Sequence, residues 1–305
     1  MTPEPGELYE LHLESSALDD LGEPVLVHAL DGYVDAGSGV SLAVAHLLQS
    51  LPHSLVATFD VDQLIDYRSR RPVLTFEQNT FTTYDAPKLE LHRVTDAAGV
   101  PFLLLFGPEP DAMWERFIAA VGQLADRFAV RLTVGLMAIP MGVPHTRPTG
   151  MSSHATRPEL LAATGTQDWI GTIQVPGHAS GLLEYRFGEA GRDAIGFAAH
   201  VPHYIARADY PETARTLIQA LADSSGLLLP TAGLDEAAAK VAAQLEAQVS
   251  ENSEVAEVVA ALEQQYDAFV SATGRGLLAQ SAPLPTADEL GAQFEAFLAE
   301  RDAKG

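Results

Sequence analysis

Continuously apolar runs of strand length that alternate with amphipathic helical patterns constrain the fold of this chain more than any other feature. PVLVHAL (24–30) is such a run, and apolar side chains at helical spacing follow it from Val40 to Leu51. SLVATF (54–59) comes next, so we expect a strand–helix–strand unit with parallel pairing and a right-handed crossover. Strands that are apolar on both sides need cover on both faces of their sheet. The pattern therefore predicts an α/β domain with helices on both faces.

The same two patterns continue along the chain. PFLLLF (101–106) predicts a strand, and apolar positions from Met113 to Phe128 predict a helix after it, with Asp111 as its N-cap. Pro211 opens a further helix at its first position. The remaining strand candidates are RLTVGLMAIP (131–140), WIGTIQV (169–175), LLEYRF (182–187) and AIGFAAH (194–200), and LELHRV (89–94) is predicted as an edge or hairpin strand.

The composition shifts after Pro230 toward alanine and glutamate. Apolar spacing predicts helices over 234–249 and 254–270. We therefore predict an α/β domain of residues 1–230 and a helical C-terminal extension of residues 231–305. This extension either caps the domain or serves as an oligomerisation arm.

The last predicted helix of the chain follows a linker that contains Gly and Pro. Thr286 and Glu289 form a capping box at its start. Its apolar side chains are Leu290, Phe294, Phe297 and Leu298.

Charge and composition exclude several classes of function. The chain carries 41 acidic and 18 basic residues, a net charge of −23, which repels nucleic acid phosphates and anionic membranes. It has no cysteine, which excludes disulfides, thiolate catalysis and cysteine-bound metals. The N-terminal MTPEPGELYELHLES lacks the basic and apolar parts of a signal peptide, and no apolar run approaches the roughly 20 residues that span a bilayer. We expect a soluble cytoplasmic protein with no nucleic acid or membrane partner.

DGYVDAGSG (31–39) places three glycines, two aspartates and a serine between a predicted strand and a predicted helix. The glycine spacing does not fit a dinucleotide fingerprint, and Ser38 stands where a phosphate-binding loop has its lysine. Asp31 and Asp35 would also repel phosphate. Two interpretations stay open. The segment is a structural turn with Ser38 or Gly37 as the helix cap, or its free N–H groups bind a ligand carboxylate.

DVDQLIDYRSRRP (60–72) gathers several cations and acids after the second strand. Tyr67, Arg68, Arg70 and Arg71 could form a clamp for an anion or a peptide carboxylate, because arginine binds carboxylates through two parallel hydrogen bonds. Alternatively, the neighbouring aspartates pair with these arginines and hold a surface loop, each pair contributing ~0–1 kcal/mol.

Five of the ten histidines lie between residues 145 and 203, close to predicted strand ends. GVPHTRPTGMSSHATRP contains His145, Arg147 and His154, and His178 and His203 follow in later segments. Ligands of open α/β sheets bind at the carboxyl ends of strands, so these positions suit a binding or oligomer-contact site. Histidines can also bind metals or act as acid and base, but no metal-binding motif accompanies them, so we expect no metal.

The order of the segments DGYVDAGS, DYRSRRP, GVPHTRP, PGHASGLL and HVPHYIARADYP resembles the actinobacterial branch of the proteasome assembly chaperone 2 family, over roughly residues 8–225. The resemblance implies a three-layer α/β/α domain around a mixed, mostly parallel sheet, similar to phosphorylase/hydrolase-like folds. It also implies self-association, with a trimer as one form, and proteasome-related partners. It implies no catalytic residue and no cofactor.

Three hypotheses of function follow. The first, which the resemblance favours, is a non-catalytic assembly or interaction protein. The second is a hydrolase or phosphorylase-like transferase with its active site at the carboxyl rim of the sheet, and the third is a module that binds a small ligand. A single pocket lined by residues 31–39, 66–71, 145–154 and 178–181 would favour an enzyme, and their separation would favour a scaffold.

Overall fold

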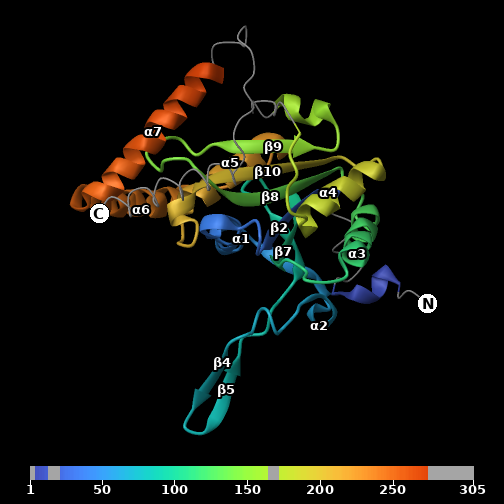
Figure 1. Ribbon diagram of the computed structural model, residues 1–305. Coiled ribbons are helices and arrows are strands. Elements are labelled where there is room, and N and C mark those ends of the chain that lie inside the picture. The colour runs from blue at the N-terminus through green and yellow to red at the C-terminus, as the bar shows by residue number, and fades with distance from the viewer. Residues whose placement is uncertain (1–3, 13–20, 164–171, 274–305) are drawn as a thin grey trace.

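A mixed eight-stranded sheet forms the centre of the molecule (Figure 1). The computed structural model describes residues 4–12, 21–163 and 172–273 of the 305. The strand order is β1-β3-β6-β7-β2-β8-β10-β9. The strands are β1 (Tyr9–Leu11), β2 (Val25–Asp31), β3 (His53–Phe59), β6 (Glu90–Thr95), β7 (Pro101–Pro108), β8 (Leu132–Met141), β9 (Met151–Ala155) and β10 (Ala194–Pro202).

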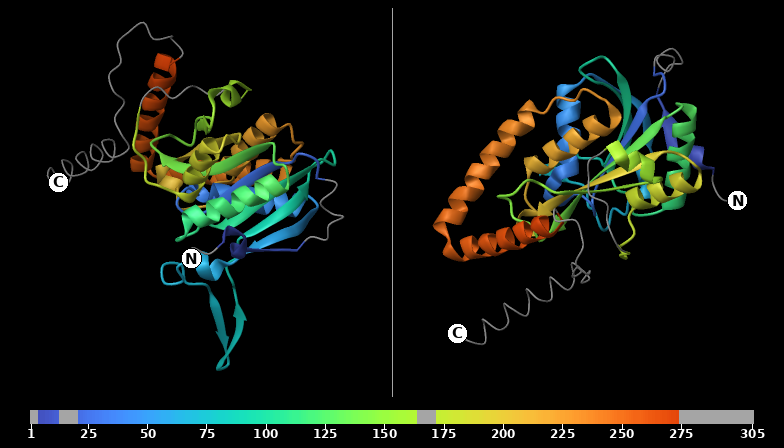
Figure 2. Two further views of the ribbon diagram at one scale, coloured as in Figure 1. Left: turned by 90° about the vertical axis from the view of Figure 1, so that its right-hand side faces the viewer. Right: turned by 90° about the horizontal axis from the view of Figure 1, so that it is seen from above.

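Helices cover both faces of this sheet, as the apolar strands require (Figures 1 and 2). One face packs on α1 (Gly39–Ser50) and α5 (Pro211–Ser225), and the other on α3 (Trp114–Arg127) and α4 (Ala179–Glu189). Strand β2 shows why both faces of the sheet need this cover. Its Val27 lies in the core that packs on α1 and α5, whereas Leu26 and Leu30 lie in the core that packs on α3 and α4, because side chains alternate along a strand. The three-layer α/β/α fold is confirmed.

The centre of the sheet is parallel and its flanks are antiparallel. Strand β2 pairs in parallel with β7 and β8, and β8 pairs in parallel with β10. Strands β1, β3 and β6 on one side and β9 on the other form antiparallel pairs. The expected parallel pairing of 24–30 with 54–59 is wrong, because β6 and β7 lie between β2 and β3.

Strands β6 and β7 enter the sheet between β2 and β3 as one unit, because a tight turn joins them. Strands β6 and β7 form a hairpin in which the buried Asp96 carboxylate accepts hydrogen bonds from the N–H groups of Ala98 and Val100. The hairpin prediction for LELHRV is confirmed. An edge position is wrong, because β3 pairs with its other side.

LLEYRF (182–187) lies in α4 and is not a strand. Leu183 and Phe187, four residues apart, are both buried, whereas Tyr185 between them is 61% exposed. This spacing is helical, and the His178 side chain caps the helix by accepting from the Gly181 N–H. WIGTIQV is also not confirmed. Residues 172–175 form no strand, and 169–171 lie outside the described residues.

The predicted helices that fall among the described residues are confirmed as α1, α3, α5, α6 and α7, with one change at the start of α3. Helix α5 begins at Pro211, and α6 (Ala232–Glu251) and α7 (Ser253–Thr273) follow. The N-cap of α3 is Met113 rather than Asp111, whose carboxylate instead accepts from the Asp66 N–H. The helix predicted from Thr286 lies outside the described residues, and the division at residue 230 stays a prediction.

Helices α6 and α7 form an arm that extends away from the sheet (Figure 2, right). Most of their side chains are exposed, and Leu234, Val259 and Leu262 are their buried apolar residues among those described. Within the described part of the chain, no helix is long and apolar enough to cross a membrane.

Candidate functional site

A two-stranded hairpin projects from the body between Arg71 and Leu89 (Figures 1 and 2). It consists of β4 (Leu74–Glu77) and β5 (Thr80–Tyr84), which the sequence patterns did not predict. Its register pairs Leu74 with Tyr84 and Phe76 with Phe81, so these four side chains share one face. We call this set the apolar hairpin face.

The apolar hairpin face is open to solvent. Its four side chains are between 53% and 65% exposed, and the Phe76 and Phe81 rings lie 5.0 Å apart. The opposite face is polar, and the hydroxyls of Thr75 and Thr83 are hydrogen-bonded at 2.7 Å. A lone two-stranded hairpin is marginally stable in water, and a contiguous exposed apolar patch typically marks an interaction site. The hairpin therefore has the chemistry of a docking arm.

The arginine-rich loop lies at the base of this hairpin. Arg70 forms an ion pair with Asp111 at 2.7 Å, and the Tyr67 hydroxyl donates to Asp62 at 2.5 Å. Arg68 and Arg71 are exposed. The loop thus anchors the hairpin to the start of α3 through Arg70 and leaves two cations at the surface beside it.

Two carboxylates meet where β2 and β7 end. Glu109, directly after β7, is 6% exposed, and its N–H donates to the Asp31 carbonyl at 2.8 Å. Its carboxylate accepts from the Ala179 N–H at 2.7 Å, at the first turn of α4. Burial raises the pKa of Asp31, and the Glu109 charge raises it further, while Arg70 opposes both.

Gly32 permits this close approach. Its φ is 146°, and a Cβ there would lie 3.3 Å from the Glu109 side chain. The ring of His178 lies 6.5 Å from that of Tyr33. The Nδ1 atom of His178 accepts from the Gly181 N–H at 3.0 Å, and burial lowers the pKa of His178, so the imidazole is a neutral acceptor.

The sheet therefore brings three predicted residues together, Asp31, Arg70 and His178, around Glu109. The sequence analysis did not single out Glu109. Its signal was a carboxylate directly after an apolar strand, in GPEPD. The charges of this cluster are mostly satisfied within it, because Glu109 occupies the start of α4 and Asp111 pairs with Arg70. An incoming anion would find the helix N-terminus already occupied.

A row of residues beneath α4 crosses four strands in register. His28 on β2 lies opposite Gly135 on β8, Gly135 opposite Gly196 on β10, and Gly196 opposite His154 on β9. Each imidazole lies over a glycine. A Cβ would come within 2.7 Å of the His28 ring at Gly135 and within 2.1 Å of the His154 ring at Gly196.

The two imidazoles of this row have different surroundings. The Nδ1 atom of His154 lies 2.8 Å from the Glu184 carboxylate of α4. His28 is 2% exposed, and burial lowers its pKa to about 3. Its Nδ1 and the buried Ser180 hydroxyl have no hydrogen-bond partner among the described residues.

The glycine turn DGYVDAGSG is a helix cap built on Asp35. The Asp35 carboxylate accepts from the Val40 N–H at 2.6 Å and from the Ser41 hydroxyl at 2.5 Å. Gly37 and Ser38 adopt left-handed conformations with φ of 63° and 51°. Ser38 occupies the N-cap position of α1, but its side chain makes no capping hydrogen bond. Asp35 thus takes the N–H groups that a ligand carboxylate would need.

His145, Arg147 and His203 lie against other elements. His145 Nδ1 is 2.6 Å from the Tyr204 hydroxyl, and His203 begins the short helix η5 (His203–Ile205). Arg147 pairs with two acids of α7, Glu263 at 3.1 Å and Asp267 at 2.8 Å. The candidate residues therefore divide into separate groups, and the described chain has no cluster of three or more side chains that could hold a metal ion.

The fold and these groups define an α/β/α-layered protein with an exposed apolar hairpin and a helical arm. A PAC2 family model matches residues 29–249, and the chain belongs to the PAC2 family, as the order of its sequence segments indicated. Among curated proteins, none matches the chain.

Three solved structures show how close its relatives are. A Mycobacterium tuberculosis protein of unknown function, Rv2714, is 50% identical, with a TM-score of 0.84 over 90% of this chain and 92% of its own. A Corynebacterium glutamicum protein of unknown function is 43% identical, with a TM-score of 0.81 over 87% and 98%. The M. tuberculosis proteasome-assembly chaperone homologue Rv2125 is 27% identical, with a TM-score of 0.70 over 77% and 99%.

Proposed function

We propose that this protein is a non-catalytic assembly or interaction protein that self-associates through the apolar hairpin face. The exposure of that face carries the proposal, because burial of its four large apolar side chains in a contact between copies would be favourable. Burying an apolar side chain of this kind contributes about 1.5–3 kcal/mol relative to exposure. The charged groups at the carboxyl ends of the strands also support a non-catalytic role. Arg70 pairs with Asp111, and Glu109 accepts a hydrogen bond at the start of α4, so both hold elements of the fold together.

Proteasome-related proteins are the partners that the family suggests. The similar M. tuberculosis protein is described as a proteasome-assembly chaperone homologue, and this supports the same class of partner here. The cytoplasmic location expected from the sequence is part of the proposal, and so is a homo-oligomer, with a trimer as one form.

The hairpin is tested by a double substitution, Phe76→Ser with Phe81→Ser, followed by sedimentation velocity. We expect the natural chain to be an oligomer and the variant to be a monomer with an unchanged circular dichroism spectrum. The matched control is Thr75→Ala with Thr83→Ala on the polar face, which should leave the oligomer intact. A monomeric natural chain, or an oligomer that survives the phenylalanine substitutions, would contradict the proposal.

The partner class needs a separate experiment. The protein is co-expressed with the proteasome α- and β-subunits of its own organism, and native electrophoresis follows the assembly intermediates. We expect the protein to migrate with α-subunit intermediates and to be absent from the finished particle. Unchanged intermediates would remove proteasome-related proteins from the proposal and leave self-association standing.

A further inference from the structure

A second exposed apolar surface lies at the carboxyl ends of β2 and β7, where α3 and α4 begin. Tyr33 follows β2, Met113 precedes α3, and Ile173 and Val175 precede α4. Their side chains are between 47% and 64% exposed. We call these four residues the rim patch.

Contacts between neighbouring residues bring the three segments of the rim patch together. The Tyr33 ring lies 6.5 Å from that of His178, and the Tyr33 N–H donates to the Glu109 carboxylate at 3.4 Å. A Cβ at Gly177 would lie 3.7 Å from the Trp114 ring, so the segment before α4 runs beside the start of α3. The rim patch is therefore one surface, and an exposed apolar surface of this kind typically marks an interaction site.

Met113 is an unusual residue for its position. It is the N-cap of α3, and its φ of 56° lies in the left-handed region, where residues other than glycine are uncommon. Serine, threonine, aspartate and asparagine stabilise an N-cap through a side-chain hydrogen bond, and Met113 makes none. Neither capping nor burial within the protomer explains an apolar side chain here, whereas a contact with another molecule would.

The apolar hairpin face matches the rim patch in kind and in size. It also consists of four large side chains, three of them aromatic. Together the two surfaces hold eight of the 15 large apolar side chains that are exposed among the described residues. Docking one surface on the other covers both. Two hairpin faces paired with each other would instead leave the rim patch in water.

The hairpin of the same protomer does not cover its own rim patch. Every residue of β4 and β5 except Thr75 is exposed, and the hairpin projects away from the body (Figure 1). Arg70 fixes the hairpin base to Asp111, two residues before Met113. Hairpin and rim patch thus lie on either side of one attachment point, so a hairpin that reaches the patch comes from a second copy.

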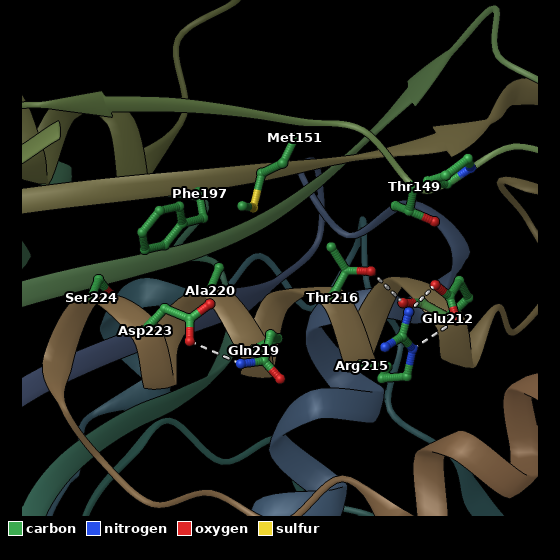
Figure 3. A pocket seen from close by; sticks show the side chains of 11 residues that line it. Thr149, Met151, Phe197, Glu212, Arg215, Thr216, Gln219, Ala220, Asp223 and Ser224 are labelled. Carbon is green, nitrogen blue, oxygen red and sulfur yellow. Dashed lines mark hydrogen bonds and ion pairs between the residues drawn. The ribbon is translucent and has the colours of Figure 1, made fainter. Parts of the chain in front are cut away.

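The groove between α5 and the edge strand β9 is a poorer receptor for the hairpin (Figure 3). Its volume is about 430 Å³. Phe197 and Ala220 on its walls are only 1% and 6% exposed. Polar side chains of α5 lie along it, including the ion pair of Arg215 with Glu212 at 2.6 Å. The groove therefore has little apolar surface left to cover.

We propose that the apolar hairpin face of one copy docks on the rim patch of a second copy. This inference rests on the proposed self-association, and it names the surface that receives the hairpin. Each copy then uses two different surfaces, its own hairpin and its own rim patch. Contacts between two different surfaces close into a ring when the rotation between copies allows it.

The rim patch is tested by Ile173→Ser with Val175→Ser, in an exposed segment that belongs to no helix or strand. In sedimentation velocity we expect the association constant to fall about tenfold or more, with an unchanged circular dichroism spectrum. The matched control is Val100→Ser with Leu228→Ser, which are 48% and 58% exposed near the amino end of β7. It should leave the oligomer intact.

Mixing two variants identifies which surfaces meet. The rim variant keeps its hairpin, and the Phe76→Ser, Phe81→Ser variant keeps its rim patch. An equal mixture should therefore form a dimer that neither variant forms alone. Amide hydrogen exchange in 172–177 should also be several-fold slower in the natural oligomer than in the monomeric hairpin variant, because the docked hairpin covers that segment.

The outcomes separate this inference from the proposed function. A rim variant that associates as well as the natural chain would overturn the inference. If the hairpin variant is then monomeric, the hairpin faces pair with one another and the proposed function stands. A mixture that stays monomeric, or equal exchange rates in 172–177, would also overturn the inference. Association that survives the hairpin substitutions would contradict the proposed function itself.

Discussion

At the scale of residues, burial keeps His28 neutral far below the pH at which a free histidine becomes charged. Burial lowers its pKa to about 3, and the neighbouring His154 and His178 oppose its charge further. The unfolded chain binds this proton near pH 6.5, so stability that is full above that pH is lost as the pH falls below it. For one proton the loss is about 1.4 kcal/mol per pH unit.

His28→Phe should remove this dependence while keeping a ring over Gly135. We expect the difference in free energy of unfolding, variant minus natural chain, to rise by about 1.4 kcal/mol for each unit by which the pH falls below about 6.5. The other histidines titrate equally in both proteins, so the difference isolates His28. Urea unfolding across this pH range measures it, and parallel pH profiles would show that His28 is not held neutral.

The glycine under His154 makes a second prediction at this scale. A Cβ at Gly196 would lie 2.1 Å from Cε1 of His154, so Gly196→Ala must displace the ring and separate it from Glu184. We expect a loss of about 1–3 kcal/mol in the free energy of unfolding. Gly122→Ala in α3 is the control. The nearest atom is 3.7 Å away there, and the change should stabilise by about 0.5–1 kcal/mol. Two equal effects would contradict this account.

At the scale of elements, periodicity predicted the elements with strong patterns and failed where the pattern was short or ambiguous. The apolar runs located β2, β7, β8 and β10 because each is buried on both faces. They also located β3, although its buried residues, Val56, Ala57 and Phe59, all lie in the core that packs on α3 and α4. LLEYRF was misassigned because six residues with alternating character fit a strand as well as a helix, and the cap at His178 decided the outcome. Strand β9, MSSHA, is too short and polar to be recognised.

Contacts between distant segments were beyond the reach of sequence patterns. The neighbours of β3 depend on the β6–β7 hairpin rather than on β3 itself. At the rim, the positions of Asp31, Arg70 and His178 after predicted elements were visible, but their common partner Glu109 was not. Only the sheet order brings the ends of β2 and β7 to the same place as the start of α4.

One arginine supplies two ion pairs between α7 and the segment that follows β8. Arg147 pairs with Glu263 and Asp267, and Arg147→Ala removes both ion pairs. We expect faster amide hydrogen exchange across 253–273 and unchanged exchange in the sheet. Arg192→Ala is the control, because its pair with Asp126 joins α3 to the start of β10 and does not involve α7. Unchanged exchange in α7 would show that other contacts hold the helix.

At the scale of the whole molecule, charge and apolar surface are separated. Helices α6 and α7 carry eight acidic residues and one lysine, a net charge of −7 out of the −23 of the chain. The segment 67–88, which contains the hairpin, carries four basic and two acidic residues, a net charge of +2. Copies of this protein therefore repel one another overall, while the hairpin offers an apolar contact in a region of net positive charge.

This separation predicts the effect of salt on self-association. If the apolar hairpin face drives the contact, raising the salt concentration from about 0.05 M to about 0.5 M should increase the association constant several-fold. The reason is that salt screens the repulsion between acidic copies and leaves the burial of apolar surface intact. Sedimentation equilibrium at the two concentrations measures the association constant. Arg68→Ala with Arg71→Ala is the control variant and should keep the same direction of change. Weaker association at high salt, relieved by that variant, would show that ion pairs of the exposed arginines hold the copies together instead.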